Sequence, residues 1–332
     1  MWLPRIDPDF SPSWFNPASV ASAFQRAQRP GTSLAAQNMP SLPPEIIRKG
    51  KLSYSSYQHA AHIDKPVFVH VGNTKHRSAL LPLALVCKET QTWMTPLLYH
   101  SVHLTKARHI RNIYEAFNHS ASLIQHLWIG PVDGAYNAEL DYGSPSWPVV
   151  VVHDLLALCS NLRSLTIINL SQNLFYQLAD VIPASIESLS MGPIHGPLIL
   201  GHLMQRPRIR NFTSGQSYMR DDEVQDIILS PYLRRFRRIG LGSAYSSAVA
   251  QSECVSVSRT LEEMQIVLCG QDRGSEVLER IMETTLRSYT DDKRVSVTPN
   301  PLHDWISVLF EEFQVEYTIF VGTALLSGKV SR

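Results

Sequence analysis

Leu162-Arg163-Ser164-Leu165-Thr166-Ile167 and Ile186-Glu187-Ser188-Leu189-Ser190-Met191 are two copies of one short pattern, with apolar residues at the first, fourth and sixth positions. The pattern returns over 209–214 and 233–238 without the last aliphatic residue. These four copies begin 24, 23 and 24 residues apart. Such a period predicts stacked units, each a short strand with a return segment, that bury their apolar faces only against one another.

Two further copies, Ile124–Ile129 and Leu261–Ile266, extend the series in both directions. The segments between copies fit return helices, because Val149–Cys159, Leu174–Val181 and Asp222–Leu229 carry apolar residues at helical spacing. A period of about 20–29 residues with this spacing is typical of leucine-rich repeats. We therefore expect an α/β fold in which residues 105–300 form a horseshoe-like leucine-rich-repeat solenoid.

Composition narrows the classes of function. The chain has 332 residues, is 44% hydrophobic, and carries 30 basic against 29 acidic residues, so it lacks the basic excess typical of nucleic-acid binding. The four cysteines are far apart, which favours a reducing compartment, either cytoplasm or nucleus. The longest apolar run near an end, Val315–Leu326, is shorter than the roughly 20 residues of a membrane-spanning helix. We expect neither nucleic acid nor membrane as a partner.

Both ends of the chain differ from the repeats. Residues 1–39 are rich in Pro, Ser, Ala, Gln and Asn, and predict a disordered extension. Toward the other end, Ser275–Tyr289 predicts a helix, Arg294–Val297 a strand and Pro301–Phe313 a closing helix. We expect residues 301–332 to form a cap helix and tail, since the end of a solenoid requires a cap.

Between the extension and the repeats, residues 40–104 predict a small helical unit. A helix start at Leu42–Ile47 precedes an irregular insert over 51–78, and a strong helical segment follows at Ala79–Glu89. Pro96 is expected to break the next helical segment, and Ser101–Leu104 alternates like a strand.

Three segments of this unit, Leu42–Ile47, Leu83–Lys88 and Thr95–Tyr99, resemble the F-box motif of the F-box/leucine-rich-repeat families of mushroom-forming fungi. The resemblance implies a three-helix unit that binds the Skp-type adaptor of a cullin–RING (SCF-type) ubiquitin ligase. It also implies repeats that present an unknown protein substrate. The adaptor-facing residues that it implies are Leu42, Pro43, Ile46, Ile47, Leu83, Val86 and Cys87.

The alternative is a leucine-rich-repeat interaction scaffold whose degenerate F-box is no longer coupled to ubiquitination. Where the family continues its first helix with an acidic and an aliphatic residue, this chain has Lys49 and Gly50. Glycine inside a helix costs about 1 kcal/mol relative to alanine.

The candidate substrate-binding residues follow from side-chain alternation along the repeat strands. Residues between the apolar positions point to the opposite, concave face. The expected substrate-binding set is Trp128, Thr166, Ser190, Thr213, Arg235, Arg237 and Gln265. We expect Trp128 to be an exposed anchor, because aromatic residues and arginine dominate binding hot spots.

Arginines cluster around the fifth copy of the pattern, at Arg234, Arg235, Arg237 and Arg238, with Arg208 and Arg210 nearby. Such a run is suited to bidentate recognition of an acidic or phosphorylated partner. The alternative is a solvated basic edge.

No pattern indicates an enzyme, a cofactor or a metal. His59 and His62 have no cysteine partners at a zinc-site spacing, and no nucleophile–base context is recognisable. Gly240–Gly242 lacks the third glycine and the following helix of a dinucleotide loop, so we expect an inter-repeat turn. Asp221–Glu223 is interpreted as an acidic helix N-terminus.

Overall fold

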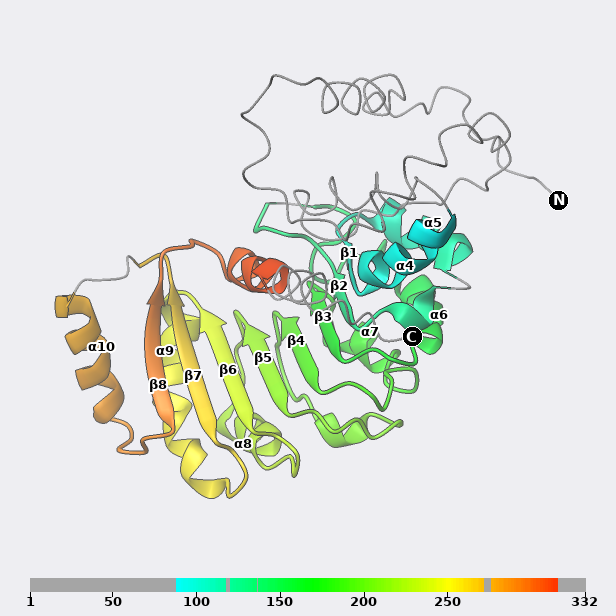
Figure 1. Ribbon diagram of the computed structural model, residues 1–332. Helices are drawn as coiled ribbons and strands as arrows, with labels where there is room; N and C mark the ends of the chain where they lie inside the picture. The colour runs from blue at the N-terminus through cyan, green and yellow to red at the C-terminus, as the bar shows by residue number, and fades with distance from the viewer. Residues whose placement is uncertain (1–87, 118–119, 136, 272–275, 316–332) are drawn as a thin grey trace, which may run out of the picture.

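The computed structural model describes residues 88–117, 120–135, 137–271 and 276–315 (Figure 1). Several predictions lie outside these residues: the extension 1–39, the insert 51–78, the tail from residue 316 onward, and the adaptor-facing residues Leu42, Pro43, Ile46, Ile47, Leu83, Val86 and Cys87.

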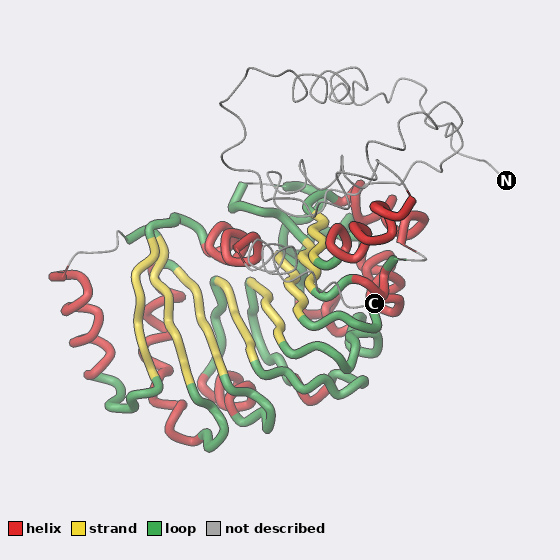
Figure 2. Tube along the Cα trace, viewed as in Figure 1, coloured by secondary structure: helices red, strands yellow, loops and turns green. Residues whose placement is uncertain are grey.

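The described chain is built on one parallel sheet of eight strands, whose order in space is their order in the sequence. The strands are β1 (Ser101–Leu104), β2 (His126–Ile129), β3 (Ser164–Ile168), β4 (Ser188–Gly192), β5 (Asn211–Gly215), β6 (Arg235–Gly240), β7 (Glu263–Cys269) and β8 (Val295–Asn300). All six copies of the repeated pattern lie side by side in β2 to β7, as a solenoid-like α/β fold requires (Figures 1 and 2).

Helices precede, connect and follow the strands. The α-helices are α4 (Lys88–Tyr99), α5 (Ala107–Phe117), α6 (Val149–Leu158), α7 (Gln172–Tyr176), α8 (Asp221–Ile228), α9 (Gly242–Ala250) and α10 (Glu276–Arg287). Short 3-10 helices are η2 (Ala121–Leu123), η3 (Leu200–His202) and η4 (Gln251–Val257). The helices expected between Val149 and Cys159, between Asp222 and Leu229, and between Ser275 and Tyr289 are confirmed, whereas the one expected over 174–181 is a shorter helix followed by turns.

Two local predictions were wrong. Pro96 lies inside α4 and does not break it. Gly242 begins α9, so a helix does follow the glycine pair; its small residues carry no amphipathic pattern that would have revealed it. The strand expected at Ser101–Leu104 is confirmed as β1, the first strand of the sheet, which pairs with β2.

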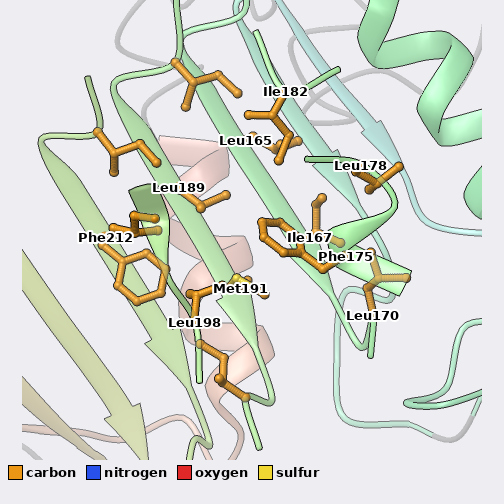
Figure 3. Packing of buried hydrophobic residues seen from close by; sticks show 14 of the residues in the cluster. Leu165, Ile167, Leu170, Phe175, Leu178, Ile182, Leu189, Met191, Leu198 and Phe212 are labelled. Atoms are coloured by element: carbon orange, nitrogen blue, oxygen red, sulfur yellow. The ribbon is translucent and has the colours of Figure 1, made fainter. Parts of the chain in front are cut away.

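The main core lies between the sheet and its return segments. At the fourth position of every repeat an apolar side chain points to this side, and each of them is at most 1% exposed: Leu127, Leu165, Leu189, Phe212, Phe236 and Met264. Figure 3 shows Leu165, Leu189 and Phe212 on neighbouring strands, in the same apolar cluster as Phe175 and Leu178 from a return segment. Each such side chain contributes about 1.5–3 kcal/mol by burial, so the stack of repeats is held by its own apolar ladder.

The C-terminal helix, residues 305–315, was predicted to cap the end of the sheet. It lies on a face of the sheet instead. Asp304 caps its start, since its Oδ1 accepts a hydrogen bond from the Ser307 amide at 2.8 Å. The helix then runs back across the opposite face of the sheet, where Figure 1 shows it in orange-red inside the bend. The physical reason is that this face carries apolar residues of its own, which the helix covers.

Candidate functional site

The concave face, defined here as the sheet face turned away from the main core, carries three rows of side chains that run across the strands. The amino-terminal row is His126, Ser164, Ser188, Asn211, Arg235 and Glu263. The middle row is Trp128, Thr166, Ser190, Thr213, Arg237 and Gln265. The carboxyl-terminal row is Ile168, Gly192, Gly215, Ile239 and Val267. Hydrophobicity therefore rises toward the carboxyl ends of the strands.

The C-terminal helix covers the apolar part of the concave face. It contributes Trp305, Ile306, Val308, Leu309 and Phe313 to a second apolar cluster, and the sheet contributes Trp128, Ile168, Ile239, Val267 and Cys269. Two glycines shape the contact, because a Cβ atom at Gly215 would overlap the Trp305 indole and one at Gly192 would overlap the Gly215 carbonyl. The indole thus lies directly on the backbone of β5.

Trp128 is fully buried, so its prediction as an exposed anchor is wrong. Its ring lies 5.0 Å from that of Phe310 and 5.7 Å from that of Phe313, and its Nε1 donates hydrogen bonds to the carbonyls of Gly130 and Pro131. Thr166, beside it, is only 5% exposed. Alternation correctly assigned both residues to the concave face, but the returning helix removes them from solvent.

Arg237 contacts the C-terminal helix. Its guanidinium makes a two-pronged contact with the Glu312 carboxylate, with Nη2 and Oε1 2.6 Å apart. The Arg237 side chain is 22% exposed to solvent. A bidentate arginine–carboxylate pair fixes geometry as well as charge, so this contact sets the register of the helix on the sheet.

The arginine run does not form one continuous patch. Arg238 points into the main core, where its Nη1 donates to Gln251 Oε1 at 2.6 Å, and burial lowers its pKa to about 10. Arg235, with 67% of its side chain exposed, approaches Glu263 at 3.5 Å. The other members also have partners within the chain: Arg234 with Glu262, Arg210 with Glu187, and Arg208 over the Tyr232 ring. Arg235 is thus the most accessible arginine of β6 on the concave face.

The rest of the predicted set lies at the border of the covered region. Ser190, Thr213 and Gln265 are half-buried in the middle row, and Gln265 Nε2 donates to Thr298 Oγ1 at 3.3 Å. The neighbouring amino-terminal row is open over Ser164, Ser188, Asn211 and Arg235, which are half-buried or exposed. These polar side chains make an open strip alongside the C-terminal helix.

The first edge of the sheet carries His100, His103 and His126. The rings of His100 and His126 lie 4.9 Å apart, and His103 stacks on Phe310 at 5.6 Å. Burial lowers the pKa of His100 to about 3, with further lowering by His126 and Arg163, and burial also lowers the pKa of His126. Both shifts favour the neutral rings, and two positive charges at this distance would repel each other.

Within the described residues, no group of three or more His, Cys, Asp or Glu residues is placed to hold a metal ion. Burial raises the pKa of the Cys159 thiol to about 12 and that of Cys269 to about 11, so both remain protonated and are poor nucleophiles at neutral pH.

Among the residues of the four described ranges, no helix is both long and apolar enough to cross a bilayer. Comparison of the chain with family models, with curated proteins and with solved structures finds no match.

Proposed function

We propose that this protein is a non-catalytic substrate receptor of a cullin–RING ubiquitin ligase. Its leucine-rich repeats bind a protein substrate through the concave face, and its F-box-like N-terminal unit binds a Skp-type adaptor. The observation that carries the proposal is the strictly sequential parallel sheet, in which each copy of the repeated pattern supplies one strand. That is the arrangement by which leucine-rich repeats build an extended binding surface.

The junction between the two units also supports the proposal. The Thr95–Tyr99 segment, which resembles the last part of the F-box motif, lies in α4 directly before β1. Leu97 and Leu98 of this segment are buried. Helix α4 therefore joins the end of the F-box-like segment directly to the first strand of the sheet.

Substrate contact is assigned to the open strip and its border. Arg235, Asn211 and Ser188 supply donors and acceptors along the amino-terminal row, and Ser190, Thr213 and Gln265 lie beside them in the middle row. Trp128 and Thr166 are not part of this open strip, because both are buried while helix 305–315 lies on the concave face.

Co-purification with the adaptor tests the ligase role. The full chain should retain a Skp-type adaptor, and Ile46→Asp should lose it, because a buried charge at an apolar interface is costly. Retention of the adaptor by Ile46→Asp would contradict the assignment. If the wild-type chain binds no adaptor but captures protein partners, the scaffold alternative holds.

Capture of the substrate is tested separately. Arg235→Glu should abolish capture of the main partner while leaving adaptor binding unchanged. Arg280→Glu, an exposed arginine on α10, is the matched control and should change neither. Equal capture by the wild type and Arg235→Glu would remove Arg235 from the site.

A further inference from the structure

The C-terminal helix is separable from the rest of the fold. The main core draws on all eight strands and on most of the return segments, and none of its residues lies beyond Val297. The second cluster is distinct and joins five sheet residues to five helix residues. Removal of the helix therefore leaves the core of the sheet intact and uncovers an apolar strip on the concave face.

That strip is shaped for a helix. Trp305, Leu309 and Phe313 follow one another at four-residue spacing on the covered side of the helix, where the Trp305 indole lies on Gly215. Glu312 of the same helix reaches Arg237. Apolar anchors at three- and four-residue spacing with one fixed charge are how amphipathic helices bind in apolar grooves.

We propose that the concave face is a receptor site for an amphipathic helix of a substrate protein, and that helix 305–315 occupies this site until such a helix displaces it. The inference rests on the proposed function, in which the concave face binds a protein. The partner helix carries a large aromatic residue for the Gly215 position, apolar residues four and eight positions later, and an acidic residue for Arg237.

Displacement, rather than simple opening, follows from the chemistry of the site. An empty strip would expose Trp128, Ile168, Ile239 and Val267 together, which apolar hydration disfavours. The chain's own helix is tethered to β8 through residues 301–304 and so acts at a high effective concentration. A partner helix therefore binds strongly only if it reproduces the same contacts. Competition with the tethered helix thus excludes helices that lack them.

The test uses the full-length chain and a fluorescent peptide with the sequence of residues 301–315. In the variant Leu309→Asp with Glu312→Arg, the tethered helix is weakened and every sheet residue of the site is unchanged. This variant should bind the peptide at least about tenfold more tightly than the wild-type chain does. The single substitution Glu312→Arg weakens the tethered helix less than the double substitution does. Glu311→Arg, at an exposed neighbouring position, is the matched control and should bind the peptide like the wild type.

Charge exchange tests the assigned contact. Arg237→Glu combined with Leu309→Asp alone, so that the tethered helix keeps Glu312, should abolish binding of the wild-type peptide and give binding of a peptide that carries Arg at the Glu312 position. Hydrogen exchange of the β3–β6 amides checks that each variant keeps its sheet. A folded, weakened variant that binds no peptide would overturn the proposal, and so would a helix 305–315 that stays protected from exchange in that variant.

Two further outcomes are informative. If the weakened variant becomes dimeric as its concentration rises, the site accepts a second copy of the chain, and the proposal of a substrate helix is overturned. Adaptor co-purification is measured on the same variants: adaptor binding without peptide binding rejects this inference alone, and peptide binding without adaptor rejects the ligase role alone.

Discussion

Arg238 lies in the main core at a position where the first repeats carry an aliphatic residue, and it supplies a sharp test of the packing. It is 2% exposed, and the hydrogen-bond acceptors found for its guanidinium among the described residues are neutral oxygens. Gln251 Oε1 is its close acceptor at 2.6 Å, and the Ser217 carbonyl is more distant at 3.4 Å. Gln251 Nε2 in turn donates to Met219 O and Asp221 Oδ1. We predict that Gln251→Leu is strongly destabilising.

The magnitude follows from these contacts. The lowered pKa of Arg238, about 10, corresponds to a penalty of about 3 kcal/mol on the charged form even with Gln251 in place. Losing a hydrogen bond to a buried charge costs about 1.5–3 kcal/mol, and the orphaned Met219 carbonyl adds to this cost. The free energy of unfolding of Gln251→Leu should therefore fall by about 3 kcal/mol, equivalent to a lower Tm by about 6–12 °C.

Arg238→Met separates charge from packing. An apolar side chain of similar length removes the buried charge, so stability should fall by no more than about 1 kcal/mol, and a gain is consistent with other buried-charge replacements. The double variant should then be more stable than Gln251→Leu alone. The assay is urea unfolding followed by circular dichroism, read as ΔG with unchanged m-value. A Gln251→Leu protein as stable as the wild type would refute the reasoning.

Three other predictions follow from the described contacts. Glu223→Ala, which removes the carboxylate that accepts from the backbone amide preceding α8 at 2.8 Å, should cost about 1 kcal/mol in thermal melts. The pKa of His100 is lower in the folded than in the unfolded state, so the free energy of unfolding should decrease as pH falls below about 6.5. His100→Gln should reduce this decrease by up to about 1.4 kcal/mol per pH unit, as measured by urea titrations at pH 7 and 5. An equal pH dependence of the wild type and the variant would contradict this prediction. Gly215→Ala should raise hydrogen exchange in helix 305–315 by displacing Trp305, whereas Gly201→Ala, which meets open space, should not.

The repeats were predictable because one local pattern encodes both the strand and its buried face. Leu165 and Leu189 specify the core side, and alternation then assigns Ser164 and Ser188 to the other side with no knowledge of the fold. What alternation cannot say is whether a concave residue is covered. Trp128 was correctly assigned to that face and wrongly expected to be exposed.

The docking place of the C-terminal helix was beyond sequence reasoning for a specific reason. The amphipathic pattern of 301–313 is visible in the sequence, and it predicted a helix that exists. The surface that the helix covers, however, is assembled from strands far away in the chain. Arg237 and Glu312, for example, are separated by 75 residues. Gly192 and Gly215, which make room for the helix, are in sequence only glycines at the ends of two strands. The partner of an amphipathic helix is set by tertiary structure, which a local pattern does not encode.

The division into two apolar clusters has a consequence for synthesis on the ribosome. Strands β2 to β7 emerge before residues 305–313, which at the usual 5–20 residues per second follow β7 only after an interval on the order of seconds. During that interval the apolar strip on the concave face of the nascent chain is not covered by helix 305–315. A protein that binds during translation can reach this strip before helix 305–315 covers it. A protein that arrives later must compete with that helix.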